Sequence, residues 1–333
     1  ALWQSHGRYF KQSADEWSWQ RSMLWETVED LYTQSYVLPY LVPMLENAGA
    51  YVLMPRERDV QRNEVIADND DTDSRYGIAA YTEKGKWATA GTGFAALKPT
   101  YVGLENPFTD GTARQINCAQ KGKGSASVEW RPDIPERGEY AVYVSYKTVT
   151  NSTSSAHYTV HHLAGSSDFV VNQKMGGGTW IYLGTFEFGE GEKGYVSLSN
   201  VTPEGYKHDG KAVVTADAVR FGGGMGNIAR GGSNCEPSIS GLARSLEGAR
   251  YWLQWAGVPE EVYCPTEGEN DYNDDYMSRG DWVTWISGKS DVNPKAKDGL
   301  GIPVDLSLGF HSDAGVTPDD SIIGTLAIYT LRS

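Results

Sequence analysis

The middle of the chain carries a repeated alternation of apolar and polar residues. Such alternation occurs in residues 139–146, 156–163, 179–188, 194–199 and 212–221. Glycine-rich turns, among them Gly176–Gly178 and Gly222–Gly224, separate these segments. A period of two is typical of strands with one buried face, and glycine clusters mark the turns between them. We therefore predict an antiparallel β-sandwich over residues 99–224.

The region before the sandwich has a mixed pattern. Residues 1–6 read as a strand, and residues 17–48 carry apolar positions at helical spacing. Pro39 and Pro43 interrupt the helical run, so we expect a helix that is kinked or split there. A short apolar strand is predicted at residues 50–54. Strand, helix and strand in this order make a βαβ unit, which implies a parallel sheet.

The region after the sandwich returns to this mixed pattern. We predict an amphipathic helix at 238–255, an acidic aromatic loop at 267–281, and strands at 304–310 and 324–331. Inserted domains enter at surface loops whose two ends lie close together. Residues 1–98 and 225–333 are therefore expected to form one domain. The predicted fold class is α/β, with an amidase-like mixed or parallel sheet and flanking helices, interrupted by the sandwich.

Composition and charge narrow the classes of partner. The 333 residues include 29 Lys and Arg against 43 Asp and Glu, which gives a net charge of −14. So acidic a chain is a poor candidate for binding nucleic acid or anionic membrane surfaces. No apolar run approaches the roughly 18 residues of a transmembrane helix. No secretory signal is visible. Residue 1 starts in the middle of what reads as a strand, so we expect that an upstream segment is missing or was removed.

The three cysteines suggest no zinc–thiolate site. Cys118, Cys235 and Cys264 lack the CxxC spacing that such sites use. Cys235 and Cys264 flank one helical segment, and two alternatives stay open for them: a disulfide bond, or two buried free thiols.

Two histidines carry the candidate chemistry. His6 and His311 each follow an apolar strand, and the acidic pair Glu29 and Asp30 opens the predicted βαβ helix. Sites in open parallel sheets form outside the carboxyl ends of the strands. Two imidazoles and one carboxylate make a tripod with one vacant position, as in catalytic zinc sites, and zinc chemistry suits amide hydrolysis. The alternative is that both histidines are ordinary strand-end residues.

The first and last thirds of the chain resemble the zinc-dependent N-acetylmuramoyl-L-alanine amidase family of the Amidase_3 type. The resemblance rests on His6-Gly7, on the stretch from Asp30 to Arg56 that contains Leu45-Glu-Asn-Ala-Gly49, and on His311. It implies a Zn²⁺ cofactor held by His6, His311 and one acidic residue. Counting back from Gly49 and Arg56 places that residue at Asp30. The family's usual residue is Glu, so Glu29 stays open as well.

The middle third resembles the golvesin-type β-sandwich found beside such domains in Bacteroidetes proteins that are often labelled xanthan lyase. One feature departs from the amidase pattern, because the family's catalytic glutamate lies well after the third metal ligand and only 22 residues follow His311. The last helix and strand of the fold are therefore expected to be absent, and a second polypeptide could complete it. The catalytic acid or base stays unknown, since Asp313, Glu267 and Glu269 are poor substitutes.

Two acidic segments were weighed as further sites. The predicted loop at 267–281 combines carboxylates with aromatic residues, so we predict substrate contacts from Glu269, Asp271, Tyr272 and Arg279, or else an ordinary surface loop. Asp271–Asp275 begins like a calcium loop, but Tyr276 and Trp282 stand where glycine and glutamate are required. Asp68–Asp73 is similarly acidic, and solvated loops or unspecific calcium binding are the alternatives for both segments.

Three functions follow as hypotheses. The first is a periplasmic or cell-surface zinc amidohydrolase that cuts an amide in peptidoglycan or a related glycopeptide. The second is a non-catalytic subunit of the cell envelope that binds a glycan or a partner protein. The third, suggested by the common label, is a polysaccharide (xanthan) lyase. None of them involves nucleic acid or a transmembrane segment.

Overall fold

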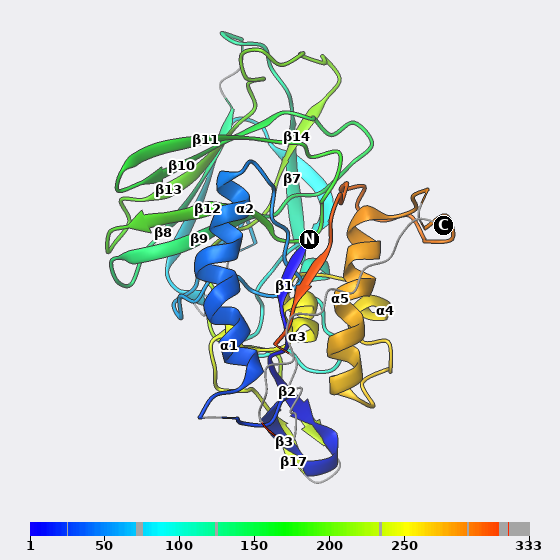
Figure 1. Cartoon of the computed structure of the whole chain (residues 1–333). Coiled ribbons are helices and arrows are strands. Elements are labelled where there is room, and N and C mark those ends of the chain that lie inside the picture. The colour runs from blue at the N-terminus through cyan, green and yellow to red at the C-terminus, as the bar shows by residue number, and fades with distance from the viewer. Residues whose placement is uncertain are drawn as a thin grey trace.

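Antiparallel sheets build most of the molecule. The computed structural model describes residues 1–24, 26–70, 76–123, 126–232, 235–291, 293–312 and 319. The sheets form a sandwich, and a group of helices packs beside it around a short two-stranded sheet (Figure 1).

Three sheets form the sandwich, and all their strand pairings are antiparallel. The five-stranded sheet has the order β11 (Gly165–Val171), β10 (Ala156–His162), β13 (Tyr195–Ser199), β8 (Ser127–Pro132) and β5 (Ala79–Lys84). The four-stranded sheet has the order β12 (Ile181–Phe188), β9 (Gly138–Val144), β15 (Val219–Phe221) and β4 (Val65–Ala67). The three-stranded sheet contains β14 (Val213–Ala216), β7 (Gly111–Asn117) and β6 (Ala88–Gly93).

The predicted antiparallel sandwich is confirmed, and its strands begin earlier than expected. Burial alternates residue by residue along β8, β10 and β13, as the sequence pattern requires. Strands β4, β5 and β6 lie between residues 65 and 93 and pair with later strands. The predicted boundary at residue 99 therefore lies after the first three strands of the sandwich. Sequence reasoning missed β5 and β6 because most of their residues are exposed, so apolar and polar positions do not alternate along them.

The predicted α/β fold with an amidase-like parallel sheet is wrong. Among the described strands, the parallel pair is β1 (Leu2–Gln4) with β18 (Leu308–Phe310), a sheet of two strands. Residues 50–54 form no strand, although Leu2 donates one backbone hydrogen bond to Leu53. Their apolar pattern reflects a small core instead, in which Val52 and Met54 pack with residues of β1 and the first helices. An apolar run indicates burial, and burial does not require a sheet.

The helix predicted at 17–48 exists in its second half. It runs through α1 (Glu29–Tyr36), a π-helical segment η2 (Val37–Leu41) that contains Pro39, and α2 (Val42–Asn47). The irregular segment confirms the predicted interruption at the prolines. Residues before α1 form a hairpin of β2 (Arg8–Lys11) and β3 (Glu16–Trp19), with the short helix η1 (Gln12–Ala14) between the strands.

The later helices also differ from the prediction. The helix expected at 238–255 is confined to η5 (Arg244–Leu246) and α3 (Ala249–Trp255), after a small hairpin of β16 (Arg230–Gly232) and β17 (Cys235–Ser238). A short helix, α4 (Glu260–Tyr263), follows. The loop expected at 267–281 is wrong, because α5 (Asp271–Ser287) begins there. Asn270 starts this helix by accepting a hydrogen bond from the backbone of Asn273, an N-cap that the loop prediction missed.

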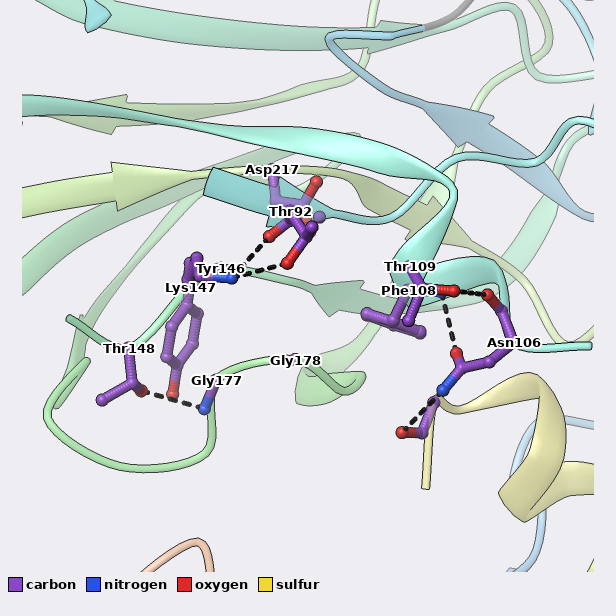
Figure 2. Close-up of a pocket in the computed structure, with 12 residues that line it drawn as sticks. Thr92, Asn106, Phe108, Thr109, Tyr146, Lys147, Thr148, Gly177, Gly178 and Asp217 are labelled. Atoms are coloured by element: carbon purple, nitrogen blue, oxygen red, sulfur yellow. Dashed lines mark hydrogen bonds between the residues drawn. The ribbon is translucent and has the colours of Figure 1, made fainter. Parts of the chain in front are cut away.

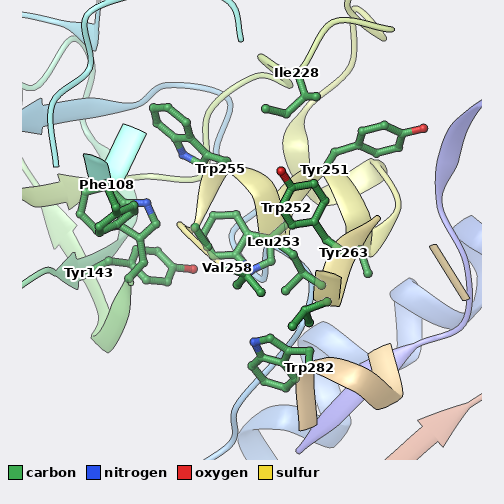
Figure 3. Close-up of a cluster of buried hydrophobic side chains, with 14 of the residues drawn as sticks. Phe108, Tyr143, Ile228, Tyr251, Trp252, Leu253, Trp255, Val258, Tyr263 and Trp282 are labelled. Atoms are coloured by element: carbon green, nitrogen blue, oxygen red, sulfur yellow. The ribbon is translucent and has the colours of Figure 1, made fainter. Parts of the chain in front are cut away.

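An aromatic core joins the helices to the sandwich. Trp252 and Trp255 of α3 pack with Tyr143 of β9 and with Phe108 of the short helix η4 (Pro107–Thr109) (Figure 3). Arg220 lies within this core. Its guanidinium carbon is 3.9 Å from the centre of the Tyr143 ring, and its Nη2 is 2.7 Å from Glu57 Oε2. The two parts of the molecule therefore share one buried interface.

Cys118, Cys235 and Cys264 are free thiols, so the disulfide alternative for Cys235 and Cys264 is not realised. Among the described residues, no helix is long and apolar enough to cross a membrane.

Candidate metal centre

Three segments meet at one end of the two-stranded sheet. Parallel pairing of β1 with β18 sets Gln4 opposite Phe310, so both chains leave the sheet in the same direction. His6 and His311 follow these strands, and Glu29 is the first residue of α1. Residues from opposite ends of the chain are thereby brought to one place.

The three side chains form a compact group. One nitrogen of each imidazole and one oxygen of Glu29 lie within 4.8 Å of one another. His311 Nδ1 is 3.2 Å from Glu29 Oε1, and the two imidazole ring centres are 4.9 Å apart. The backbone N–H of Ser312 also donates to Glu29 Oε1 at 3.1 Å. His6 and Glu29 are buried while the His311 side chain is 37% exposed, which leaves the group open on one side.

Glu29 occupies the place that counting assigned to Asp30. Asp30 does not belong to the group, and its buried carboxyl makes no hydrogen bond. Burial raises the pKa of Asp30 to about 6 against the opposing charge of Arg56. Burial also raises the pKa of Glu29, but the hydrogen bond from His311 and the nearby imidazoles outweigh it and hold that pKa below its ordinary value.

Arg56 fixes the end of β1. Its guanidinium donates to the backbone carbonyls of Gln4, His6, Ser245 and Glu247. A guanidinium presents five N–H donors in a rigid plane, so one side chain can hold several irregular carbonyls at once. Arg56 thereby gives His6 a defined position.

His6 is in the protonation state that a metal ion requires. Burial, followed by the charges of Arg279 and Arg21, lowers the pKa of His6 to about 3. The imidazole is neutral at neutral pH, and neutral imidazole is the metal-binding form. The buried His6 Nε2 has no hydrogen-bond partner. Two imidazole nitrogens and a carboxylate oxygen are a donor set that fits zinc.

Arg279 competes for the lone pair of His6. Its Nη2 lies 3.1 Å from His6 Nδ1, and it also pairs with Asp275 on the same helix. A neutral imidazole has one lone pair, so donation from Arg279 to Nδ1 leaves the proton on Nε2. A metal ion on either nitrogen therefore requires that Arg279 release Nδ1. This predicted substrate residue contacts a candidate ligand instead of an open cleft.

Arg21 and Tyr272 lie next to the group. Arg21 Nε is 3.3 Å from Glu29 Oε2, and Arg21 Nη1 donates to the Tyr272 hydroxyl at 2.6 Å. The Tyr272 ring also contacts the rings of Tyr9 and Tyr276, with centres 5.7 and 6.0 Å away. Tyr272 was a predicted substrate residue, whereas Arg21 was missed because an isolated arginine before a helix belongs to no pattern.

The other predicted substrate residues lie elsewhere. Asp271 is fully buried, and it accepts hydrogen bonds from Arg230, Arg250 and Tyr251. It therefore serves the core and offers no contact to a substrate. Glu269 lies exposed in the turn before α5. Asp313 and the strand predicted at 324–331 lie outside the described residues, as do Asp71 and Asp73 of the first acidic segment.

The sandwich contains a separate cavity of about 270 Å³ (Figure 2). Tyr146, Lys147 and Thr148 line one side of it, and Asn106 and Thr109 line the other. Lys147 donates to the backbone carbonyl and the hydroxyl of Thr92. The wall thus combines hydroxyl, amide and ammonium groups with aromatic rings.

Residues 65–223 match the Golvesin C-terminal domain. The golvesin resemblance of the middle third is thus confirmed, with a start that agrees with β4. We call these residues the Golvesin-type domain. The match includes none of His6, Glu29 and His311, so it does not bear on the metal centre.

Two further comparisons involve xanthan lyases. The chain is 32% identical over 160 residues to a "Xanthan lyase" of Bacillus sp. strain GL1, covering 47% of this chain and 14% of that protein. It thus spans about a seventh of that relative's length. The solved structure of a Paenibacillus xanthan lyase is 28% identical over 48% of this chain and 13% of that one, with a TM-score of 0.36.

The solved CBM35 of Cellvibrio japonicus Abf62 is 14% identical, covers 52% of this chain and 99% of its own, and has a TM-score of 0.28.

Proposed function

We propose that this chain is a zinc-dependent amide hydrolase of the cell envelope that acts on peptidoglycan or a related glycopeptide, in the periplasm or at the cell surface. The observation that carries the proposal is the convergence of His6, Glu29 and His311 within 4.8 Å. These residues come from opposite ends of the chain, and two imidazoles with one carboxylate leave a fourth zinc position open.

Each residue has a defined part in this proposal. When bound, zinc supplies a Lewis acid that polarises a carbonyl and lowers the pKa of water. His6 and His311 offer imidazole nitrogens, and Glu29 offers a carboxylate oxygen that Arg21 and Ser312 hold in place. The Arg21 side chain is 32% exposed beside Glu29, so its positive charge is partly accessible from solvent. We expect it to favour substrates with a carboxylate near the scissile amide.

The catalytic acid or base stays unassigned. Among the described residues, no fourth carboxylate, histidine or cysteine joins the group of three. The proposal therefore rests on the metal centre. Hydrolysis requires, in addition, a catalytic acid or base.

The experiment combines metal analysis with an activity assay. The protein is saturated with zinc, dialysed, and analysed for metal content, and is then incubated with muropeptides while released peptides are followed by mass spectrometry. Glu29→Gln is the test variant and Asp30→Asn is its matched control, because the two residues are neighbours of like charge. We expect one zinc per chain and peptide release in the wild type and in Asp30→Asn, with both lost in Glu29→Gln. A chain that retains no zinc contradicts the proposal.

A second function is favoured by the Golvesin-type domain. We propose that this domain binds glycan through the cavity beside Lys147, in support of hydrolysis or, in a non-catalytic subunit, in its place. The match to residues 65–223 and the relative named xanthan lyase support this proposal. Binding of soluble polysaccharides by isothermal titration tests it, with Lys147→Met as the variant expected to lose affinity. The lyase alternative predicts a rise in ultraviolet absorbance when acidic polysaccharide is added.

A further inference from the structure

The Golvesin-type domain contains a buried carboxylate without a partner. Asp68 follows directly after β4, and it is 4% exposed. Neither of its carboxylate oxygens has a side-chain partner, and only the backbone N–H groups of Asn69 and Asp70 face them. A lone ionised carboxylate in a protein interior is strongly unfavourable, so such groups are protonated, paired with a cationic side chain, or bound to a metal ion.

Two more carboxylates lie beside Asp68. Strand β4 pairs with β15 so that Ala67 lies opposite Val219, which brings Asp68 alongside the turn that contains Asp217. Asp217 is buried, and its carboxylate accepts hydrogen bonds from the Phe94 backbone and the Ser145 hydroxyl.

The third carboxylate is Asp70. It accepts hydrogen bonds from the backbone and the hydroxyl of Thr112, and Thr112 lies opposite Thr92 in the β6–β7 pair. Two segments of the domain, the stretch after β4 and the turn before β15, therefore bring negative charge to one place.

Among the residues that the structure describes, no cationic side chain pairs with Asp68. Burial and then the charges of Asp217 and Asp70 raise the pKa of Asp68 well above its ordinary value. Lys147 lies on the cavity side of Asp217, where it donates to Thr92 (Figure 2). The residue after Asp68 in the chain also has a buried oxygen without a partner, the amide oxygen Asn69 Oδ1, while its Nδ2 donates to the Thr112 carbonyl.

The donor atoms identify the class of ligand. Carboxylate and amide oxygens are the ligands of hard cations, whereas zinc sites prefer imidazole and thiolate. Ca²⁺ accepts an irregular arrangement of oxygens, and Mg²⁺ demands near-octahedral geometry and retains its waters. We infer that Asp68, with Asn69 Oδ1 and the Asp217 carboxylate, forms a calcium site that fastens the end of β4 to the turn between β14 and β15. This site is separate from the zinc centre and goes beyond the proposed function.

The test is the response of the full chain to calcium. Metal-free protein is titrated with CaCl₂ in a calorimeter, and its thermal unfolding is followed with CaCl₂, with MgCl₂ and without metal. We expect one Ca²⁺ per chain and a rise in Tm of roughly 5 °C when calcium is about a hundredfold above Kd. MgCl₂ is expected to give a smaller shift.

Asp68→Asn is the informative variant, because it removes the buried charge with almost no change of shape. Without calcium at neutral pH, we expect Asp68→Asn to have a higher Tm than the wild type, and we expect calcium to leave that Tm unchanged. Glu190→Gln removes an exposed charge of the same domain and should respond to calcium like the wild type. His311→Ala should keep the full calcium response, which separates this inference from the zinc proposal.

Two results would overturn the inference. One is a wild type that neither binds millimolar Ca²⁺ nor changes its Tm. The other is a folded Asp68→Asn that keeps the wild-type shift. If Asp68→Asn does not fold, the calorimetric titrations decide. One calcium site present in both the wild type and His311→Ala supports the inference, and its absence from either protein overturns it.

Discussion

The Golvesin-type domain and the region around the metal centre stabilise their backbones in different ways. The domain is built on strands that pair with other strands, over a core of fully buried apolar residues such as Val128, Val160 and Leu198. The metal region has a two-stranded sheet and long irregular segments. Its interior contains buried ionic side chains, among them Arg56, Arg250 and Asp271.

Buried arginines replace part of a sheet in the metal region. Carbonyl groups in a buried, irregular backbone need hydrogen-bond donors. Arg56 supplies them to four carbonyls on two segments, including that of His6. Such a site depends on single side chains, whereas a sheet distributes its support over many backbone bonds. The two regions should therefore respond differently to substitution.

The largest effect is expected at the metal ligands. His311→Ala removes one of three zinc donors from a partly exposed position, so it should reduce zinc affinity about a thousandfold with little change in folding. His208→Ala, in the Golvesin-type domain, is the matched control and should bind zinc like the wild type. Competition with a chromogenic chelator measures both affinities. Equal affinities in the two variants would show that the centre does not bind zinc as described.

Arg56→Met tests the role of buried arginines. The substitution leaves four backbone carbonyls without a hydrogen-bond donor, so we expect the free energy of unfolding to fall by about 3 kcal/mol. We also expect weaker zinc binding, because His6 is displaced. Arg137→Met breaks an exposed pair with Glu187 in the Golvesin-type domain and should cost less than about 1 kcal/mol. Urea denaturation measures both. Similar losses in the two variants would remove the distinction between the regions.

Asp30→Asn should stabilise the protein in a pH-dependent way. The folded-state pKa of Asp30 is about 6, above the value of about 3.9 in an unfolded chain. Stability from this group is therefore fully present below pH 4 and is lost as the pH rises through 6. Relative to the wild type, Asp30→Asn should gain about 2 kcal/mol at pH 8 and almost nothing at pH 4. Urea denaturation at the two pH values checks this, and an equal gain at both would contradict it.

The smallest effect is expected at Arg279. Because its hydrogen bond to His6 and zinc exclude each other, Arg279→Gln should raise zinc affinity about tenfold. Chelator competition at neutral pH measures the change. A loss of affinity would mean that Arg279 supports the bound state instead of opposing it.

Part of the fold and part of the site could be predicted from the sequence. Alternating strands such as β8 and β13 have one buried face, and that is a local property of the sequence. The prediction of a parallel sheet was wrong because the apolar residues in 50–54 pack into a small core and do not pair as a strand. The helix α5 was missed because its buried residues include Asp271, Asp274 and Asp275, which read as a loop when their arginine partners are unknown.

The candidate site shows the same limit. The sequence pattern identified two histidines at the ends of strands, and the structure places them together with an acidic residue. Whether that residue was Glu29 or Asp30 depended on a one-residue rotation of α1, which no local pattern fixes. Arg21 and Arg279 act on the site through contacts with Glu29 and His6 that link distant segments, so only the structure reveals them.

Crystals of the zinc-saturated protein provide the most direct test of the central claim. An anomalous difference map collected on both sides of the zinc absorption edge locates the metal without reference to activity. We predict one strong peak within bonding distance of His6, Glu29 and His311. A zinc-saturated crystal without a peak at that position, or with its zinc bound by other residues, would contradict the account.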